Sequence, residues 1–399
     1  MGARDFSAIR PAMQRYVDAD ILPGVSWAVL AGREVAETGC VGWADREAKT
    51  PLGTDHLFRV FSNTKLVTSC AVLMLLEEGR FQLDDPAEKY LPQLANRRVL
   101  RPGATDPEDT EPAAGPITIR HLMTHTSGLA YGVLDPGTLM FRLYNEKRAL
   151  NPATPLADMM DTLAGLPLAY HPGTSWEYSI ATDVLGRLVE VLSGRRLDDF
   201  LRIRIFEPLG MVDTGFVAKD KSRLAAYYAG ADILEPMKPG LKLEPMKPGL
   251  TRLVDHPYPG AFVVPVARLS GGGGLVSTLP DMIALVKSLM PGGELLRPQT
   301  IALMRTNQLG AGKCIRFARM GEVPGKGFGL AGAVTLDPSA IEPAGSAGEL
   351  EWGGIAGTHW WIAPQGKFAG LVMTQRQMGF WHPFAAEFKR LAYAAAGSA

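Results

Sequence analysis

The stretch Ser62-Asn63-Thr64-Lys65 opens the most apolar segment of the chain, which runs from Leu66 to Leu76. This segment is apolar nearly all round, as expected of a helix that is buried on most of its sides. A serine and a lysine three residues apart lie on one face of a helix, so the amine can reach the hydroxyl. Burial removes water from the amine and favours its neutral form, which can take the proton of a serine nucleophile. The pattern also arises by chance on solvated helices, but this chain contains it only once.

Composition excludes several classes of partner. The chain has 399 residues, and 41 basic residues balance 41 acidic ones, so its overall charge attracts neither nucleic acid nor a membrane surface. The longest apolar run has the length of a core helix, and the N-terminus does not resemble a signal peptide. The three cysteines are odd in number and far apart, which favours reduced thiols and a cytoplasmic protein: Cys40, Cys70 and Cys314.

Hydrophobic periodicity divides the chain into a helical middle and two ends that are rich in strands. The predicted helices are 6–18, 62–78, 117–124, 155–165, 181–193, 196–206, 281–290, 299–306 and 384–396. The predicted strands are 25–30, 34–41, 57–61, 328–336, 349–362 and 368–375. This order predicts an α+β protein in which residues 1–61 and 270–399 share one antiparallel sheet, with a mostly helical domain, 62–269, inserted between them.

One local repeat interrupts this pattern. Leu234–Lys242 is repeated almost unchanged as Leu243–Leu250, and both copies are rich in proline and glycine. Two copies are too few for a repeat fold, and the prolines exclude a regular helix. The segment is either a duplicated surface loop or a flap over the functional site.

Two more segments carry chemistry. Tyr178 lies in a turn-rich loop, 171–180, just ahead of a predicted helix that starts near Ala181. A phenol beside a lysine can act as a general base and then as a general acid. Farther along, Trp352-Gly353-Gly354 lies in a predicted strand, where glycines mark the close approach of another group. The backbone N–H groups of such a strand edge can supply half of an oxyanion hole.

Taken in order, Ser62-Asn63-Thr64-Lys65, Tyr178-Ser179-Ile180 and Trp352-Gly353-Gly354 resemble the three motifs of the serine β-lactamase and penicillin-binding-protein superfamily. Within it, the chain is most similar to the family VIII carboxylesterases, which are esterases related to class C β-lactamases. The resemblance implies the serine β-lactamase-like fold, an antiparallel sheet flanked by helices with an inserted helical domain. Ile180 stands where the lactamases have asparagine, and Trp352 stands where they have lysine. Both departures point away from β-lactams and towards esters.

The resemblance also implies a role for each site residue. Ser62 would attack the ester carbonyl and become acylated, while Lys65 and Tyr178 exchange its proton. Which of these two is the base during acylation is left open. The backbone N–H groups of Ser62 and Ile355 would form the oxyanion hole, and no metal or cofactor is implied. Substrate would contact a set of wall residues: Trp352, Gly353, Gly354 and Tyr131, the last being equally compatible with ordinary packing.

These features favour a serine carboxylesterase that hydrolyses short-chain esters through an acyl-Ser62 intermediate, with weak β-lactamase side activity. A transferase that passes the acyl group to an alcohol or amine is the alternative, because related statin acyltransferases share the framework. A sensor that is acylated without turnover is the second alternative. The expected partner is a small ester, and neither its identity nor the oligomeric state follows from the sequence.

Other apparent motifs have simpler interpretations. Gly327–Gly332 matches a nucleotide-binding glycine pattern, but a strand-like segment follows it and a glycine-rich strand is expected. His121 and His125 have the spacing of a zinc pair without the glutamate such a site needs, so they are expected in the core or at a helix cap. Ser127 is expected to be a turn residue. The tandem Trp360-Trp361 is expected to pack on opposite faces of its strand.

Overall fold

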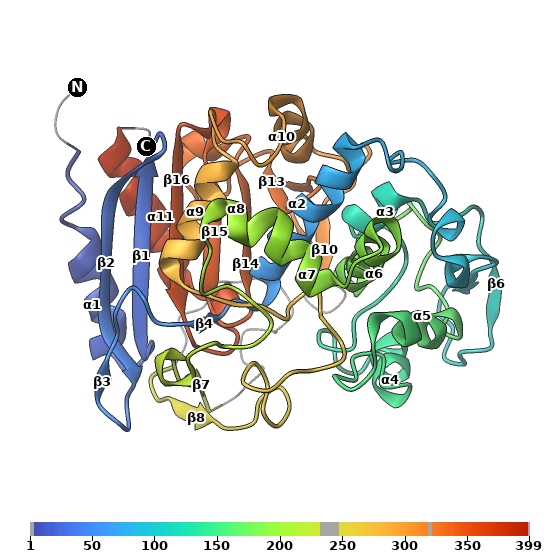
Figure 1. Ribbon diagram of the computed structural model, residues 1–399, viewed down its shortest axis with the longest axis horizontal. Coiled ribbons are helices and arrows are strands. Elements are labelled where there is room, and N and C mark those ends of the chain that lie inside the picture. Colours follow the sequence, from blue (N-terminus) through green and yellow to red (C-terminus); the bar gives the residue numbers. More distant parts are fainter. Residues whose placement is uncertain (1–3, 232–246, 318–320, 398–399) are drawn as a thin grey trace.

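A large antiparallel sheet organises the structure, a computed structural model that describes residues 4–231, 247–317 and 321–397. Its eight strands stand in the order β12-β13-β14-β15-β16-β1-β2-β3, so both ends of the chain contribute to one sheet (Figure 1). In chain order the strands are β1 (Gly24–Ala31), β2 (Glu34–Asp45), β3 (Thr50–Pro51), β12 (Lys326–Phe328), β13 (Ala333–Thr335), β14 (Leu350–Gly354), β15 (Thr358–Ile362) and β16 (Phe368–Thr374). The predicted sheet from both chain ends is confirmed.

Strands β1 and β16 join the two chain ends within this sheet. They pair antiparallel from Val25 opposite Thr374 to Ala31 opposite Phe368. Almost every residue of the two strands is buried. Because both faces of the sheet are covered, these strands can be apolar without the polar alternation of a half-exposed strand.

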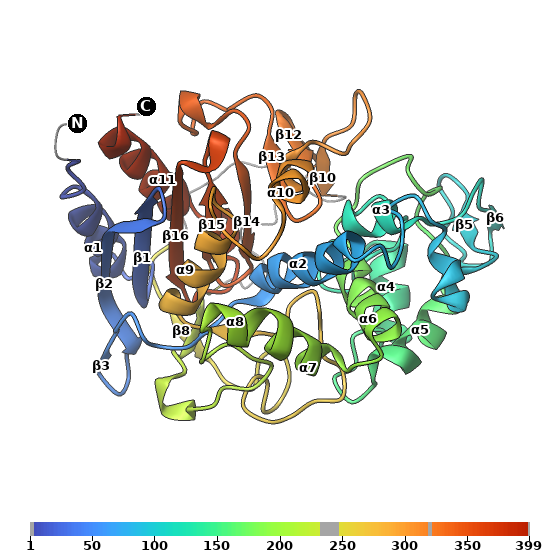
Figure 2. The same cartoon turned by 45° about the horizontal axis from the view of Figure 1, so that its top comes forward.

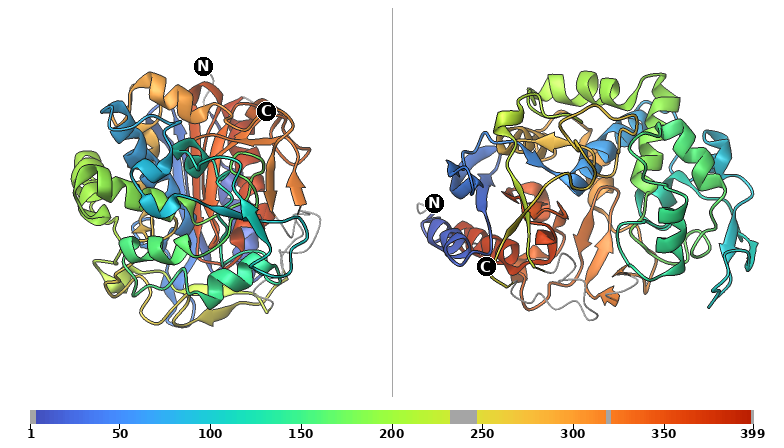
Figure 3. Two further views of the ribbon diagram at one scale, coloured as in Figure 1. Left: turned by 90° about the vertical axis from the view of Figure 1, so that its right-hand side faces the viewer. Right: turned by 90° about the horizontal axis from the view of Figure 1, so that it is seen from below.

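Helices cover the two faces. The first and last helices, α1 (Ile9–Asp18) and α11 (Pro383–Ala396), pack together along one side of the sheet, and α9 (Leu279–Ser288) packs along the other (Figure 3, right). Trp360 belongs to the core that includes α9 residues, whereas Trp361 belongs to the core that includes α1 and α11 residues. The prediction that these neighbouring tryptophans pack on opposite faces is therefore confirmed.

The helix predicted after Ser62 is α2 (Thr64–Glu77), which follows a single 3-10 turn at Phe61–Asn63. Its buried residues number 11 of 14, and Figure 2 shows it running between the sheet and the helical part of the chain. Gly79 has a φ of 70°, a left-handed conformation that stops the helix. Burial on nearly all sides explains why α2 is apolar all round.

Beyond α2, on the side away from the sheet, lie α3 (Ile119–Met123), α4 (Leu139–Glu146), α5 (Leu156–Ala164) and α6 (Ala181–Ser193) (Figure 2). The chain then runs back along α2 through α7 (Leu197–Leu201) to α8 (Glu207–Leu209), which contacts α9. The helices predicted at 117–124, 155–165 and 181–193 are confirmed, and the one at 196–206 continues past α7 as a wider π-helical turn at Arg202–Phe206. Helix α4 was not predicted. Its start is marked by Thr138, whose hydroxyl accepts the N–H of Phe141.

Three strand predictions need correction. The single strand predicted at 349–362 is a hairpin, because the chain turns at Ile355–Gly357 between β14 and β15, and Gly357 has a φ of 84°. The segment predicted as one strand at 328–336 likewise contains the end of β12, the connection at 329–332 and β13, which pairs with β12 as a hairpin. The strand predicted at 57–61 is reduced to β4 (Phe58–Arg59), because the chain turns into the 3-10 turn that holds Ser62.

Short strand pairs and one further helix lie outside the large sheet and the helices above. The strand pairs are β4 with β9 (Val276–Ser277), β5 (Arg98–Leu100) with β6 (Thr110–Pro112), β7 (Tyr227–Ala229) with β8 (Thr251–Leu253), and β10 (Ile315–Phe317) with β11 (Gly321–Val323). The remaining helix is α10 (Pro298–Arg305), which agrees with the helix predicted at 299–306. Most of the duplicated segment 234–250 lies outside the described residues.

The division into domains 1–61 with 270–399 and 62–269 stays a prediction. Within the described ranges, no helix is both long enough and apolar enough to cross a membrane.

Candidate active site

Ser62 lies at the junction between the sheet and α2. The 3-10 turn that carries it is fixed on both sides, since Val60 N–H donates to the carbonyl of Leu275 and Leu275 N–H donates to Thr64 Oγ1, at 3.1 Å each. These bonds join the turn to the strand pair β4–β9. These hydrogen bonds hold the serine at a fixed corner between β4 and α2.

Lys65, one turn farther on, points back towards this serine. Its Nζ lies 3.4 Å from Ser62 Oγ and donates to the carbonyl oxygen of Gly272 at 2.7 Å. The lysine is 3% exposed, as expected from its place on a buried helix. The space around Gly272 is crowded, because a Cβ there would lie 2.5 Å from Asp183 Oδ2 and 3.3 Å from Lys65 Nζ.

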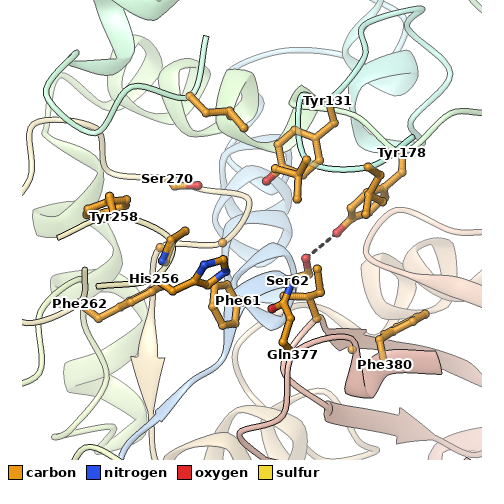
Figure 4. Close-up of a pocket in the computed structure, with 18 of the residues that line it drawn as sticks. Phe61, Ser62, Tyr131, Tyr178, His256, Tyr258, Phe262, Ser270, Gln377 and Phe380 are labelled. Carbon is orange, nitrogen blue, oxygen red and sulfur yellow. Dashed lines mark hydrogen bonds between the residues drawn. The ribbon is translucent and has the colours of Figure 1, made fainter. Parts of the chain in front are cut away.

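Tyr178 completes the predicted cluster. Its hydroxyl donates to Ser62 Oγ at 2.6 Å, the dashed line in Figure 4, and Lys65 Nζ lies 4.5 Å from the centre of its ring. The ring packs among Trp176, Trp352 and Phe317, which fix its direction. The structure thus brings together the three side chains that the motifs predicted, two from the start of α2 and one from the loop before α6.

The third motif approaches the same serine from the sheet. Trp352 Nε1 donates to the Tyr178 hydroxyl at 3.4 Å. A Cβ on Gly354 would lie 2.4 Å from the carbonyl oxygen of Val60, so only glycine lets the end of β14 pack against the turn before Ser62. The prediction that these glycines mark a close backbone approach is confirmed. Gly353 and Ile355 line the same cavity as Ser62.

This cavity has a volume of about 320 Å³ and an aromatic lining. Tyr131 lies across it from Ser62, beside Tyr178, with the two tyrosine rings edge to face at 5.8 Å (Figure 4). Burial raises the pKa of Tyr131, which keeps this phenol neutral. The other aromatic lining residues are Phe61, Phe216, His256, Tyr258, Phe262, Phe317, Trp352, Phe380 and Trp381.

Arg268 is the only Lys, Arg, Asp or Glu among the described residues that line this cavity, and sequence reasoning missed it. Its Nη1 donates to Asp183 Oδ1 at 2.9 Å, and the two side chains are 10% and 1% exposed. Asp183 was included in the predicted helix 181–193 without any role. The available signal was an acid in the first turn of a helix whose neighbouring residues are mostly apolar, but the spatial partner cannot be read from the sequence.

The competing motifs take the simpler roles that were expected. His121 caps α3 together with Thr118, and buried His125 shares a hydrogen bond of 2.9 Å with Ser179. Burial lowers the pKa of His125 well below its ordinary value, so this imidazole is neutral. Ser127 is fully buried and accepts the N–H of Leu129 within a turn. Gly327–Gly332 joins β12 to β13, as expected of a glycine-rich strand.

The described part of the chain contains no group of three or more His, Cys, Asp or Glu side chains that could hold a metal ion. At the site itself a hydroxyl, an amine and a phenol lie in mutual contact, an arrangement that suits acyl transfer to the serine.

The fold and this site together define a serine hydrolase of the β-lactamase type. The family model described as Beta-lactamase matches residues 9–394, so the chain belongs to this family. Esterase EstB of Burkholderia gladioli is 34% identical over 330 residues, which cover 80% of this chain and 78% of that one.

Two solved structures are similar over nearly the full length. One is EstCE1, described as a hydrolase with promiscuous acyltransferase activity, with a TM-score of 0.79, 28% identity, and coverage of 97% of this chain and 98% of that chain. The other is simvastatin synthase from Aspergillus terreus, in its LovD6 mutant form, with a TM-score of 0.76 and 26% identity, covering 99% and 95%. The β-lactamase-like fold expected from the motifs is confirmed.

Proposed function

We propose that this protein is a serine carboxylesterase that hydrolyses short-chain, uncharged carboxylic esters through an acyl-Ser62 intermediate. The observation that carries the proposal is the convergence of two proton-transfer groups on one hydroxyl, with Tyr178 OH at 2.6 Å and Lys65 Nζ at 3.4 Å from Ser62 Oγ. A serine becomes a useful nucleophile only when such a neighbour takes its proton.

The reaction proceeds in two halves. Ser62 Oγ bonds to the carbonyl carbon as its proton passes to Lys65 or Tyr178, and the alkoxide then leaves with a proton from Tyr178. Water next loses a proton to Tyr178 and attacks the acyl carbon, and Ser62 regains its proton as the acid departs. Either group can be the first base, since both contact the hydroxyl.

An oxyanion hole formed by the backbone N–H groups of Ser62 and Ile355 belongs to the same proposal. The close approach of Gly354 to the Val60 carbonyl supports it, because this contact brings the end of β14 to the turn that carries Ser62. The N-terminal end of α2 follows the turn and adds a positive potential near the developing oxyanion.

The lining of the cavity favours uncharged substrates. Arg268 is already paired with Asp183, so it offers the cavity little net charge. Trp352 presents an apolar ring and a single N–H, which hydrogen-bonds to Tyr178. A carboxylate placed against this wall would lose hydration without gaining a partner, at a cost of several kcal/mol. The volume of about 320 Å³ suits a small ester.

Trp352→Lys tests the selectivity. The measurement is kcat/KM for an uncharged p-nitrophenyl ester and for its carboxylate-bearing analogue. We expect the wild type to prefer the uncharged ester, and Trp352→Lys to move the ratio towards the anion by about tenfold or more, because a lysine pairs with a carboxylate. Trp43→Lys, at a surface tryptophan that is 39% exposed, is the matched control and should leave the ratio unchanged. A wild-type preference for the anion, or an unmoved ratio in Trp352→Lys, contradicts the proposed wall.

Acyl transfer to an alcohol is the second candidate, favoured by the similarity to a hydrolase with promiscuous acyltransferase activity. The time course of a chromogenic ester separates the candidates. Steady turnover in water supports hydrolysis, acceleration by added alcohol with formation of a new ester supports transfer, and a stoichiometric burst that stops supports the non-turnover sensor.

A cytosolic location is also part of this proposal. Cys40, Cys70 and Cys314 are free thiols in the structure, and the reducing cytosol is the compartment that keeps thiols in this state.

A further inference from the structure

A buried ion pair lies directly behind Lys65. Asp183 is 1% exposed, and its Oδ1 accepts from Arg268 Nη1 at 2.9 Å. The other carboxylate oxygen, Oδ2, has no hydrogen-bond partner among the described residues. A buried carboxylate oxygen without a donor is costly, and it acts electrostatically on whatever ionisable group lies nearby.

Lys65 is this nearby ionisable group, and Gly272 lies close to both Asp183 Oδ2 and Lys65 Nζ. A Cβ built on Gly272 would lie 2.5 Å from Asp183 Oδ2 and 3.3 Å from Lys65 Nζ. The carboxylate oxygen and the amine nitrogen are thus separated by no more than the sum of these two distances. A larger residue than glycine would occupy the space between them.

Aromatic side chains surround the amine of Lys65 on its other sides. Tyr131 and Tyr178 face its amine with their rings, at 5.5 and 4.5 Å. Burial raises the pKa of Tyr131, and burial together with the charge of Lys65 lowers the pKa of His125. Among the described residues, Asp183 is thus a buried carboxylate that reaches the amine across Gly272, and Arg268 is the cation paired with that carboxylate.

We propose that Asp183 and Arg268 are positioning residues that set, through opposite charges, the pH at which the Lys65–Tyr178 pair can accept the proton of Ser62. The inference rests on the proposed acylation of Ser62. The Asp183 carboxylate favours the protonated pair, and the Arg268 guanidinium favours the deprotonated pair. The sign of each effect is the same whether Lys65 or Tyr178 is the base, because both lose a proton when they act.

The test uses Asp183→Asn and Arg268→Gln, which remove one charge each, and the double variant. The measurement is the rate constant for labelling of Ser62 by an uncharged fluorophosphonate as a function of pH, with the labelled peptide identified by mass spectrometry. The acid limb of this profile is the pH range over which the rate constant rises as the base loses its proton. We expect it to move to lower pH in Asp183→Asn and to higher pH in Arg268→Gln. The expected shift is about one pH unit or more, because a close charge changes the proton affinity of a buried group by this amount. The double variant should return towards the wild type.

Two further variants separate charge from structure. Arg268→Lys keeps the cation and should keep the wild-type limb. Asp213→Asn removes the carboxylate that pairs with Arg223 at 2.9 Å, away from the lining of the cavity, and should not move the limb. Limbs that stay in place, or that move in the same direction in Asp183→Asn and Arg268→Gln, overturn the inference. Absence of Ser62 labelling in the wild type would instead refute the proposed function, and the inference would fall with it.

Discussion

At the scale of single residues, the site depends on a lysine that contacts both a hydroxyl and a backbone carbonyl. Lys65 Nζ donates to Gly272 at 2.7 Å and lies 3.4 Å from Ser62 Oγ. If Lys65 exchanges a proton, then arginine cannot replace it, because a guanidinium keeps its proton in a protein.

Lys65→Arg should therefore lose about as much kcat/KM as Lys65→Ala, which is several orders of magnitude when nucleophile and base act as a unit. The check is ester hydrolysis by the two variants, with melting curves to show that both are folded. An arginine variant that keeps a large share of the wild-type activity would mean that Lys65 supplies only charge.

At the scale of secondary-structure elements, the critical contact joins β14 to the turn before α2. Gly354 has room for no side chain, because a Cβ would lie 2.4 Å from the Val60 carbonyl oxygen and 2.5 Å from Thr358 Oγ1. Thr358 in β15 strengthens the same contact, since its hydroxyl donates to Val60 O at 3.2 Å. Two strands of the sheet thus hold the corner that carries Ser62.

Gly354→Ala should push β14 away from this corner and lower kcat/KM by about a hundredfold, as expected when reacting groups are displaced by about 1 Å. Gly115→Ala is the matched control, because a Cβ there meets nothing within 4 Å, and its activity should stay at the wild-type level. Equal activities for the two variants would show that this contact does not position the site.

The same scale shows what sequence patterns could and could not predict. Helix α2 was predictable because its apolar composition and the spacing of Ser62 and Lys65 are local properties. The hairpin of β14 and β15 was not, because apolar residues on both sides of the short turn at 355–357 look like one continuous strand. The Asp183–Arg268 pair beside Lys65 could not be predicted from sequence patterns either, because 85 residues separate these two residues along the chain.

At the scale of the whole molecule, a buried charge network fastens the C-terminal helix to the sheet. Lys389 in α11 donates to Glu349 and Glu351, and Lys326 in β12 donates to Glu351 from the other side. Glu349 is fully buried, so it depends on Lys389 and on the hydroxyl of Tyr393 for compensation. The carboxylates of Glu349 and Glu351 raise the pKa of Lys389, which keeps this ammonium charged.

Lys389→Met should therefore destabilise the fold by about 3–5 kcal/mol, because a buried carboxylate loses its partner. Lys367→Met, at an exposed lysine, is the control and should have little effect. The measurement is the free energy of unfolding in urea for both variants. A small loss in Lys389→Met would mean that the network contributes little to the attachment of α11.

The most direct test of the central claim is to trap the acyl-enzyme. Wild type and Ser62→Ala are mixed with p-nitrophenyl butyrate, quenched in acid within the first turnover, digested and analysed by peptide mass spectrometry. The account predicts one butyryl group on the wild-type peptide that contains Ser62, and neither acylation nor turnover in Ser62→Ala. A butyryl group on another residue such as Ser127, or steady turnover by Ser62→Ala, would contradict it.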